Sequence, residues 1–293
     1  MRRRLGLPAV LLAGSCTGLS GGGPGCEVFV EPRRLPAELD ESSGVAASLR
    51  APDVFWTHTD NGARVARMIA VDQTGAVVGE ARADQRVRDA EDLASATCPE
   101  GSCLYLADIG NNYQERDTLM VLRVVEPDPR SEAELAFQRL LFRLPSGPHD
   151  AEAIFVLPGE QLFLVTKGSD EPVTLYRYPP PLRFDTLVTL EVVQQLSETP
   201  RVLPRQVTGA AASSDGALVV LRTYETLLFH RWNGSALVPI AEEGTVNLRT
   251  LRESQGEGVG FGADGVVALT SETGPSGAGA SIALLRCRFD AAE

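Results

Sequence analysis

The sequence predicts an all-β protein, a β-propeller with five four-stranded blades. A short motif recurs five times, each copy is followed by a turn and a β-rich run, and further apolar runs precede the next copy. A repeat of about 50 residues that carries four strands is typical of propeller blades. The second and third intervals are longer and could hold extra strands, so six blades are the alternative.

The repeated motif is six residues long and begins each predicted blade. Its third positions are Ser43, Glu91, Glu152, Thr208 and Glu257, which are 48, 61, 56 and 49 residues apart. The second strands are predicted at 54–57, 104–107, 162–165, 218–221 and 266–269. Asp-Gly pairs at 215–216 and 264–265 are strong hairpin signals between first and second strands. Third strands follow, and fourth strands fit 76–79, 139–142, 190–193 and 237–240.

The ends of the chain are predicted to close the ring. The fifth repeat ends after its third strand, 281–285, and the run 27–30 can supply the missing fourth strand. Cys26 and Cys287 flank these two runs, so we expect a Cys26–Cys287 disulfide that closes a very long loop. Cys98 and Cys103 flank a turn between two apolar runs, which predicts a second disulfide, Cys98–Cys103.

The N-terminus has the order of a bacterial lipoprotein signal. Residues 2–4 are arginines, residues 5–13 are apolar, and small residues precede Cys16. We therefore expect a signal peptide at 1–15, a lipid on Cys16, a flexible tether over 16–25 and one propeller domain over 26–293. Thr17 after the cysteine favours the outer membrane of the cell envelope. The alternative is an ordinary signal peptide with an incidental cysteine.

The charge balance narrows the choice of partners. Lys+Arg 27 against Asp+Glu 39 gives a net charge of -12. Such a surface repels phosphate backbones, so nucleic acid is not an expected partner. The three histidines do not cluster, which disfavours a zinc site. We expect a monomer that contacts the membrane through its lipid and binds a small ligand, a glycan or a protein partner.

Acidic residues recur at the motif and at the ends of the second strands. Alternation along a strand predicts that the first and third motif positions point together into the central channel. The predicted channel or ligand residues are Glu41, Asp60, Asp89, Asp108, Asp150, Lys167, Arg222 and Glu272. Glu91, Glu152 and Glu257 are the predicted metal ligands, and an oxygen-rich site without histidine favours Ca²⁺. The alternative is a hydrated acidic channel in which Lys167 and Arg222 are partial counterions.

Two motif pairs resemble known bacterial exported propellers. The pairs are 257–259 with 271–272, and 89–94 with 108–112. They resemble the phytase-like (esterase-like) and SdiA-regulated families, and the resemblance covers roughly residues 38 to 290. It implies a propeller with a calcium-associated acidic channel and, in some members, hydrolysis of esters or phosphate esters.

Two functions from different classes follow from the sequence. The first is a lipid-anchored propeller that binds a ligand or partner at an acidic, calcium-occupied channel. The alternative is a calcium-dependent esterase or phosphoesterase, in which Lys167 and Arg222 contact the anion and the metal activates water. Ser43 and Thr208 stand where the resemblance calls for an acid, which argues against a complete metal site. No residue is singled out as catalytic.

Overall fold

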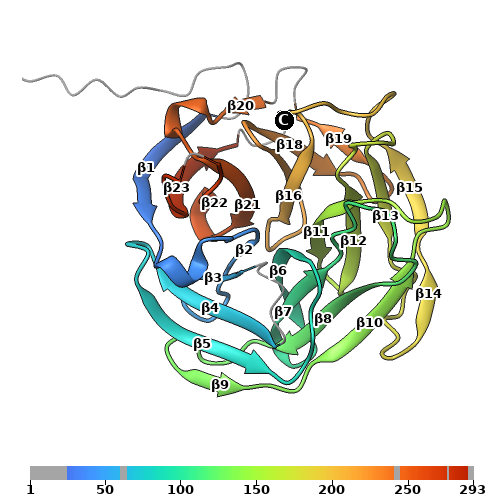
Figure 1. The fold of residues 1–293 in the computed structure, drawn as a ribbon, viewed down its shortest axis with the longest axis horizontal. Helices are drawn as coiled ribbons and strands as arrows, with labels where there is room; N and C mark the ends of the chain where they lie inside the picture. The colour runs from blue at the N-terminus through green and yellow to red at the C-terminus, as the bar shows by residue number, and fades with distance from the viewer. Residues whose placement is uncertain (1–24, 60–64, 241–244, 276, 290–293) are drawn as a thin grey trace, which may run out of the picture.

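The computed structural model describes residues 25–59, 65–240, 245–275 and 277–289. The predicted signal peptide, Cys16 with most of its tether, and Asp60 lie outside this part of the chain. Five sheets surround a central axis, so the prediction of a five-bladed all-β propeller is confirmed (Figure 1). The helices of the described residues are three short 3-10 turns, Ala37–Leu39, Arg249–Leu251 and Ala263–Gly265. Among the described helices, none is long and apolar enough to cross a membrane.

The blades, numbered I to V along the chain, are given from the axis outward. Blade I has β2 (Val45–Ala47), β3 (Val54–His58), β4 (Ala66–Asp72), β5 (Val77–Ala83) and β9 (Glu132–Glu134). Blade II has β6 (Ala90–Cys98), β7 (Gly101–Asp108), β8 (Leu119–Val125), β10 (Gln138–Arg143) and β14 (Leu187–Thr189). Blade III has β11 (Ala151–Leu157), β12 (Gln161–Thr166), β13 (Thr174–Arg177) and β15 (Glu191–Gln195). Blade IV has β16 (Val207–Ala212), β17 (Leu218–Thr223), β18 (Thr226–Trp232), β19 (Leu237–Pro239) and β20 (Thr245–Asn247). Blade V has β21 (Gln255–Phe261), β22 (Val266–Glu272), β23 (Ser281–Arg288) and β1 (Gly25–Arg34).

The two long intervals hold extra strands, but these do not form a sixth blade. Strand β9 lies between β8 and β10 of blade II in the sequence, but it pairs in parallel with β5 of the preceding blade. Strand β14 pairs in the same way with β10. Each therefore extends the outer edge of a neighbouring blade, and the count of five holds.

The ring closes through both ends of the chain, as predicted. Strand β1 pairs antiparallel with β23 at the outer edge of blade V (Figure 1). In this pairing Cys26 is directly opposite Cys287. A disulfide joins these two residues across a sequence separation of 261. The hairpin disulfide Cys98–Cys103 is also present.

The hydrophobic core is divided into five clusters, one between each pair of neighbouring blades. Strand alternation explains the division. In β3, Val54 and Trp56 pack toward blade II, whereas Phe55 packs toward blade V. Because both faces of a blade are covered, the central strands read as continuous apolar runs rather than as an alternating pattern.

Candidate functional site

Four of the five innermost strands have a β-bulge at or next to the third motif position. Pairing skips Glu91 between Ala90 and Asp92, and it skips Glu152 and Thr208 in the same way. In β21 the pairing shifts between Gly256 and Val259, which flank Glu257. Simple alternation is therefore the wrong basis for the expected side-chain directions, because a bulge adds one residue and re-aims the strand.

The fourth motif position is where the innermost strands touch one another. A Cβ atom at Gly44 would lie 2.5 Å from the Leu93 backbone nitrogen, and one at Gly258 would lie 2.7 Å from the Ser43 carbonyl oxygen. In blade II this position is Asp92, which is fully buried. Its Oδ2 accepts hydrogen bonds from Ile154 N (2.9 Å) and Ala210 N (3.3 Å), so one carboxyl group joins three blades.

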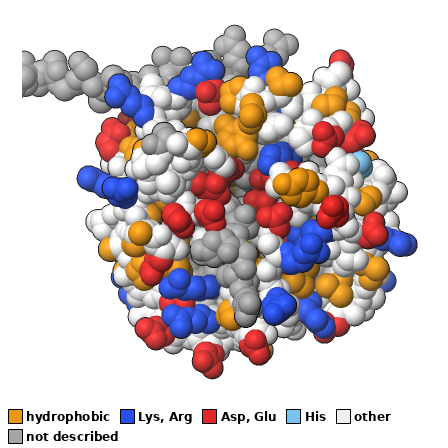
Figure 2. All heavy atoms as spheres, viewed as in Figure 1, with side chains coloured by type: hydrophobic (Ala, Val, Ile, Leu, Met, Phe, Trp, Pro, Cys, Tyr) orange, Lys and Arg blue, Asp and Glu red, His pale blue; other side chains and the backbone are white. Residues whose placement is uncertain are grey.

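Acidic side chains gather around the centre of one face of the propeller (Figure 2). Within this mouth, the Lys167 ammonium contacts Glu152 Oε1 and lies 3.6 Å from Asp150 Oδ2. Burial raises the pKa of Glu152 to about 7, assisted by the charges of Asp150 and Asp89 and opposed by Lys167. Burial works against the charge of Lys167, but its acidic neighbours outweigh burial and raise the pKa of the ammonium. Lys167 is thus a single positive charge shared by two carboxylates, those of Glu152 and Asp150.

Blades V and I add a second group of acids to the same mouth. Gln255 Nε2 donates to Glu257 Oε1 (2.7 Å) and to Glu272 Oε2 (2.9 Å), and Ser43 Oγ donates to Glu272 Oε1 (2.8 Å). Burial, together with the charges of Glu152 and Glu272, raises the pKa of Glu257 well above its usual range. Burial also raises the pKa of Glu272, with a contribution from Glu41. The two groups of acids thus act on each other as one cluster.

Blade II supplies a third part of the mouth, held by Arg116. Arg116 Nη2 donates to Asp108 Oδ1 (2.8 Å), and Asp108 Oδ1 also accepts from the backbone N–H of Asp89 (3.1 Å). A Cβ atom at Gly110 would lie 2.3 Å from Glu91 Oε1 and 2.4 Å from Asp89 Oδ2. Glycine at this position lets the backbone pass close to both carboxylates.

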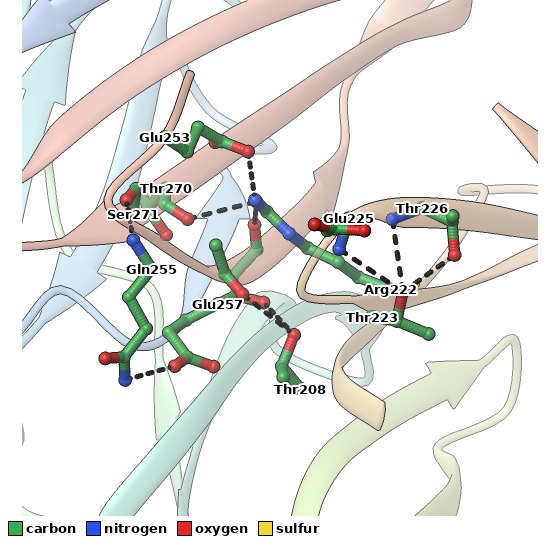
Figure 3. Close-up of polar contacts among 12 residues, drawn as sticks. Thr208, Arg222, Thr223, Glu225, Thr226, Glu253, Gln255, Glu257, Thr270 and Ser271 are labelled. Carbon is green, nitrogen blue, oxygen red and sulfur yellow. Dashed lines mark hydrogen bonds and ion pairs between the residues drawn. The ribbon is translucent and has the colours of Figure 1, made fainter. Parts of the chain in front are cut away.

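Arg222 is buried between blades IV and V and does not line the open channel. Its side chain is fully buried, and Nη1 donates to Gly258 O (2.6 Å) and Thr270 O (3.0 Å) (Figure 3). Its Nη2 donates to Glu253 Oε2 at 2.5 Å. The expected role of Arg222 as a contact for ligand is therefore replaced by a structural one that ties blade IV to blade V.

The predicted calcium ligands do not form a ready three-carboxylate site in the described chain. Among the described residues, the one group of three ligand atoms that lie within 4.8 Å of one another belongs to Cys98, Glu100 and Cys103. The two sulfur atoms of that group are joined in a disulfide. Glu152 is paired with Lys167, although the buried Glu257 Oε2 has no hydrogen-bond partner within the described part of the chain. The donor chemistry suits Ca²⁺, but the spacing does not, and Ca²⁺ stays a prediction.

Several residues of the mouth were not predicted from the sequence. They are Asp92, Arg116, Tyr224 and Glu253. Burial and the charge of Glu257 raise the pKa of the Tyr224 hydroxyl, which places this tyrosine beside the acids. Gln255, at the first motif position, was expected to point toward the channel together with Glu257, and its side chain bonds to Glu257 and Glu272. Asp92, Tyr224 and Glu253 have no local signal in the sequence because their partners lie in other blades, and Arg116 has none because it lies in the segment between β7 and β8, outside the repeated motif.

Comparisons with known proteins show the fold and leave the family undecided. No known protein family matches the chain, and neither does any curated protein. The PQQ-bound aldose sugar dehydrogenase from Streptomyces coelicolor is similar in structure, with 12% identity, a TM-score of 0.50, and coverage of 90% of this chain and 98% of that chain. A glucose dehydrogenase has 12% identity, a TM-score of 0.48, and coverage of 88% and 99%. The gluconolactonase XC5397 from Xanthomonas campestris has 14% identity, a TM-score of 0.44, and coverage of 92% and 98%.

At such low identity, the likeness to the aldose sugar dehydrogenase shows a shared propeller fold and nothing about chemistry. The resemblance to the phytase-like and SdiA-regulated families stays a prediction.

Proposed function

We propose that this protein is a lipid-anchored binding protein of the bacterial cell envelope, whose acidic channel mouth takes up a small ligand with a cationic group. The observation that carries the proposal is the shortage of positive charge at the mouth. The pKa values of Glu152, Glu257 and Glu272 are raised first by burial and then by the charges of neighbouring acids, and Lys167 offsets these effects only in part. A cation that enters the mouth relieves this repulsion.

The contacts of Lys167 support an ammonium group as the recognised feature. This side chain already lies between the carboxylates of Glu152 and Asp150, so the mouth accommodates an ammonium on oxygen acceptors alone. Glu257 and Glu272 on blade V retain acceptor capacity for a second ammonium, because each carboxylate has about four lone-pair sites. Organic amines need no fixed coordination geometry, whereas Ca²⁺ requires six to eight oxygen ligands.

Thermal melting with two cations tests this proposal. We expect CaCl₂ or putrescine, compared with NaCl of equal ionic strength, to raise the Tm of the protein. A ligand at a hundredfold excess over Kd contributes about 2.7 kcal/mol, or about 5 to 10 °C for a domain of this size. A rise with CaCl₂ that a chelator reverses supports the predicted ion, and a rise with putrescine supports an amine. If neither cation shifts the Tm, the proposal is wrong.

Matched variants locate the effect. The double variant Glu257→Gln with Glu272→Gln should remove the response to putrescine. Glu91→Gln with Glu152→Gln should remove any response to Ca²⁺ while leaving the unliganded protein no less stable. Glu31→Gln is the control, because Glu31 is exposed on β1 at the outer edge of blade V. A response that survives in both double variants would place the cation elsewhere.

A hydrolase is the second candidate, and the pKa of Glu152 favours it. A carboxyl group that titrates near 7 can accept a proton from water at neutral pH, as a general base must. Lys167 beside it could stabilise a developing anion. A screen of p-nitrophenyl esters and p-nitrophenyl phosphate tests this alternative. Activity that Glu152→Gln abolishes would support hydrolysis over binding.

The membrane anchor is tested separately. Cys16→Ala should move the mature protein from the membrane fraction to the soluble periplasmic fraction, because the lipid attaches to this sulfur. Retention of the variant in the membrane would refute the lipoprotein assignment. The result is independent of the ligand experiments.

A further inference from the structure

A cavity between blades III and IV has chemistry opposite to that of the acidic mouth. Its volume is about 400 Å³, within the range of small-molecule sites. Its apolar wall consists of Val173, Leu196, Val207, Leu221, Leu228 and Leu237. Neither Lys167 nor any acid of the mouth lines it.

The charged residues of the cavity are basic. Arg201 and Arg205 both line it from the segment that leads into β16, and none of its described lining residues is Asp or Glu. Neither guanidinium has a hydrogen bond or an ion pair with another residue in the described ranges. The third titratable group is His230, whose pKa burial lowers, so the imidazole is neutral at neutral pH. The two arginines therefore set the charge of the cavity.

An apolar wall beside two arginines favours a molecule that has both an apolar part and an anionic group. An apolar chain or ring gains free energy by leaving water for the leucine and valine wall. A guanidinium presents a planar fork of N–H donors that matches a carboxylate or sulfonate. The chain as a whole carries a net charge of -12, which repels anions, so a pair of arginines with no Asp or Glu among the described lining residues marks a place where an anion is tolerated.

We propose that the cavity between blades III and IV binds a small amphipathic anion, a medium-length apolar chain or ring that carries one carboxylate or sulfonate. The apolar part lies against Leu221, Leu228 and Leu237, and the anionic head meets Arg201 and Arg205. Arg201 is half-buried and Arg205 is exposed, so Arg201 contributes the larger share of the attraction. The proposal is independent of the acidic mouth, because the two sites share no residue.

Decanoate, below its micellar concentration, is the probe for this site. Isothermal titration calorimetry should show one decanoate bound per protein, with weaker binding of the uncharged analogue decanol and none of decylammonium. The double variant Arg201→Gln with Arg205→Gln should weaken decanoate by about tenfold or more, as expected for the loss of a charged hydrogen bond, and leave decanol unchanged. Arg86→Gln, at an exposed arginine outside the cavity, is the matched control.

A second variant tests the apolar wall. Leu228 is half-buried on β18, so Leu228→Phe should fill part of the cavity and weaken decanoate and decanol alike while the circular dichroism melt confirms the fold. Three results would each overturn the proposal. They are no binding of decanoate, equal binding of decanoate and decylammonium, and full-strength binding of decanoate by the double arginine variant.

Discussion

Replacing Glu152 by glutamine should make the protein more stable at pH 8 and change its stability little at pH 5. Glutamine has the shape of a protonated glutamate but cannot ionise. In the folded protein the side chain is buried at 4% exposure, and burial raises the pKa of its carboxyl group to about 7. Ionising Glu152 at higher pH therefore costs folding free energy that the glutamine variant does not lose.

The size and the direction of the effect follow from linkage. A carboxyl group whose pKa is higher in the folded than in the unfolded chain contributes stability that is fully present below the unfolded pKa. That stability is lost as the pH rises through the folded pKa. Between the ordinary value of 4.5 and about 7, at 1.36 kcal/mol for each pH unit, the loss is about 3 kcal/mol. Glu152→Gln should thus be more stable than the natural protein by about 3 kcal/mol at pH 8 and by less than about 1 kcal/mol at pH 5.

Urea denaturation at pH 5, 6, 7 and 8 measures this difference. The free energy of unfolding of the natural protein should fall across the series more steeply than that of Glu152→Gln. Glu31→Gln removes an acid from the exposed outer strand and should follow the natural protein at every pH.

The opposite result would refute the reasoning. If Glu152→Gln is less stable by the same amount at pH 5 and pH 8, the ion pair with Lys167 is strongly favourable and Glu152 is an ordinary structural acid. The shortage of positive charge at the mouth would then be smaller than the proposed function requires.

Three further predictions concern the framework of the site. Replacing Cys26 and Cys287 by serine should lower the free energy of unfolding by about 5 kcal/mol in the loop-entropy relation, since the bond closes a loop with a sequence separation of 261. Urea denaturation without reductant checks this, and an unchanged midpoint would show that β1 and β23 close the ring unaided. Arg222→Met should cost about 3–5 kcal/mol because it leaves Glu253 buried and unpaired. The double variant with Glu253→Gln should recover part of that loss, and no recovery would contradict the pairing. Asp92→Asn should cost about 2 kcal/mol, because an amide NH₂ must then face backbone N–H donors. Differential scanning calorimetry measures that loss, and an equal or higher Tm would show that the donors have other acceptors.

The fold was predictable because its signals are local and repeated. Each strand run and hairpin turn lies close to one copy of the motif, and consecutive copies are 48 to 61 residues apart, so the blade count could be read directly from the chain. The closure was also predictable, since a fifth repeat that lacks one strand leaves a single terminal run to complete it. The cysteines beside both runs agreed with that solution.

The acidic character of the site was predictable, but its contacts were not. The repeat placed acids at the start of the blades, and the structure brings Glu152, Glu257 and Glu272 into one electrostatic cluster. The directions of the side chains depend on a bulge in each of four inner strands. A bulge adds one residue to a strand without a distinct sequence signal. A period-two pattern therefore assigns the side chains beyond the bulge to the wrong face of the strand.

The amino-acid sequence alone determined the five blades, the closure by both ends, the two disulfides and the acids at the start of the blades. Only the tertiary structure decided that β9 and β14 extend neighbouring blades, that Arg222 is a buried brace, and that a basic cavity lies between blades III and IV. The physical reason is the distance along the chain between contacting groups. Asp92 accepts a hydrogen bond from Ala210, 118 residues away, and no local pattern in the sequence specifies such a partner.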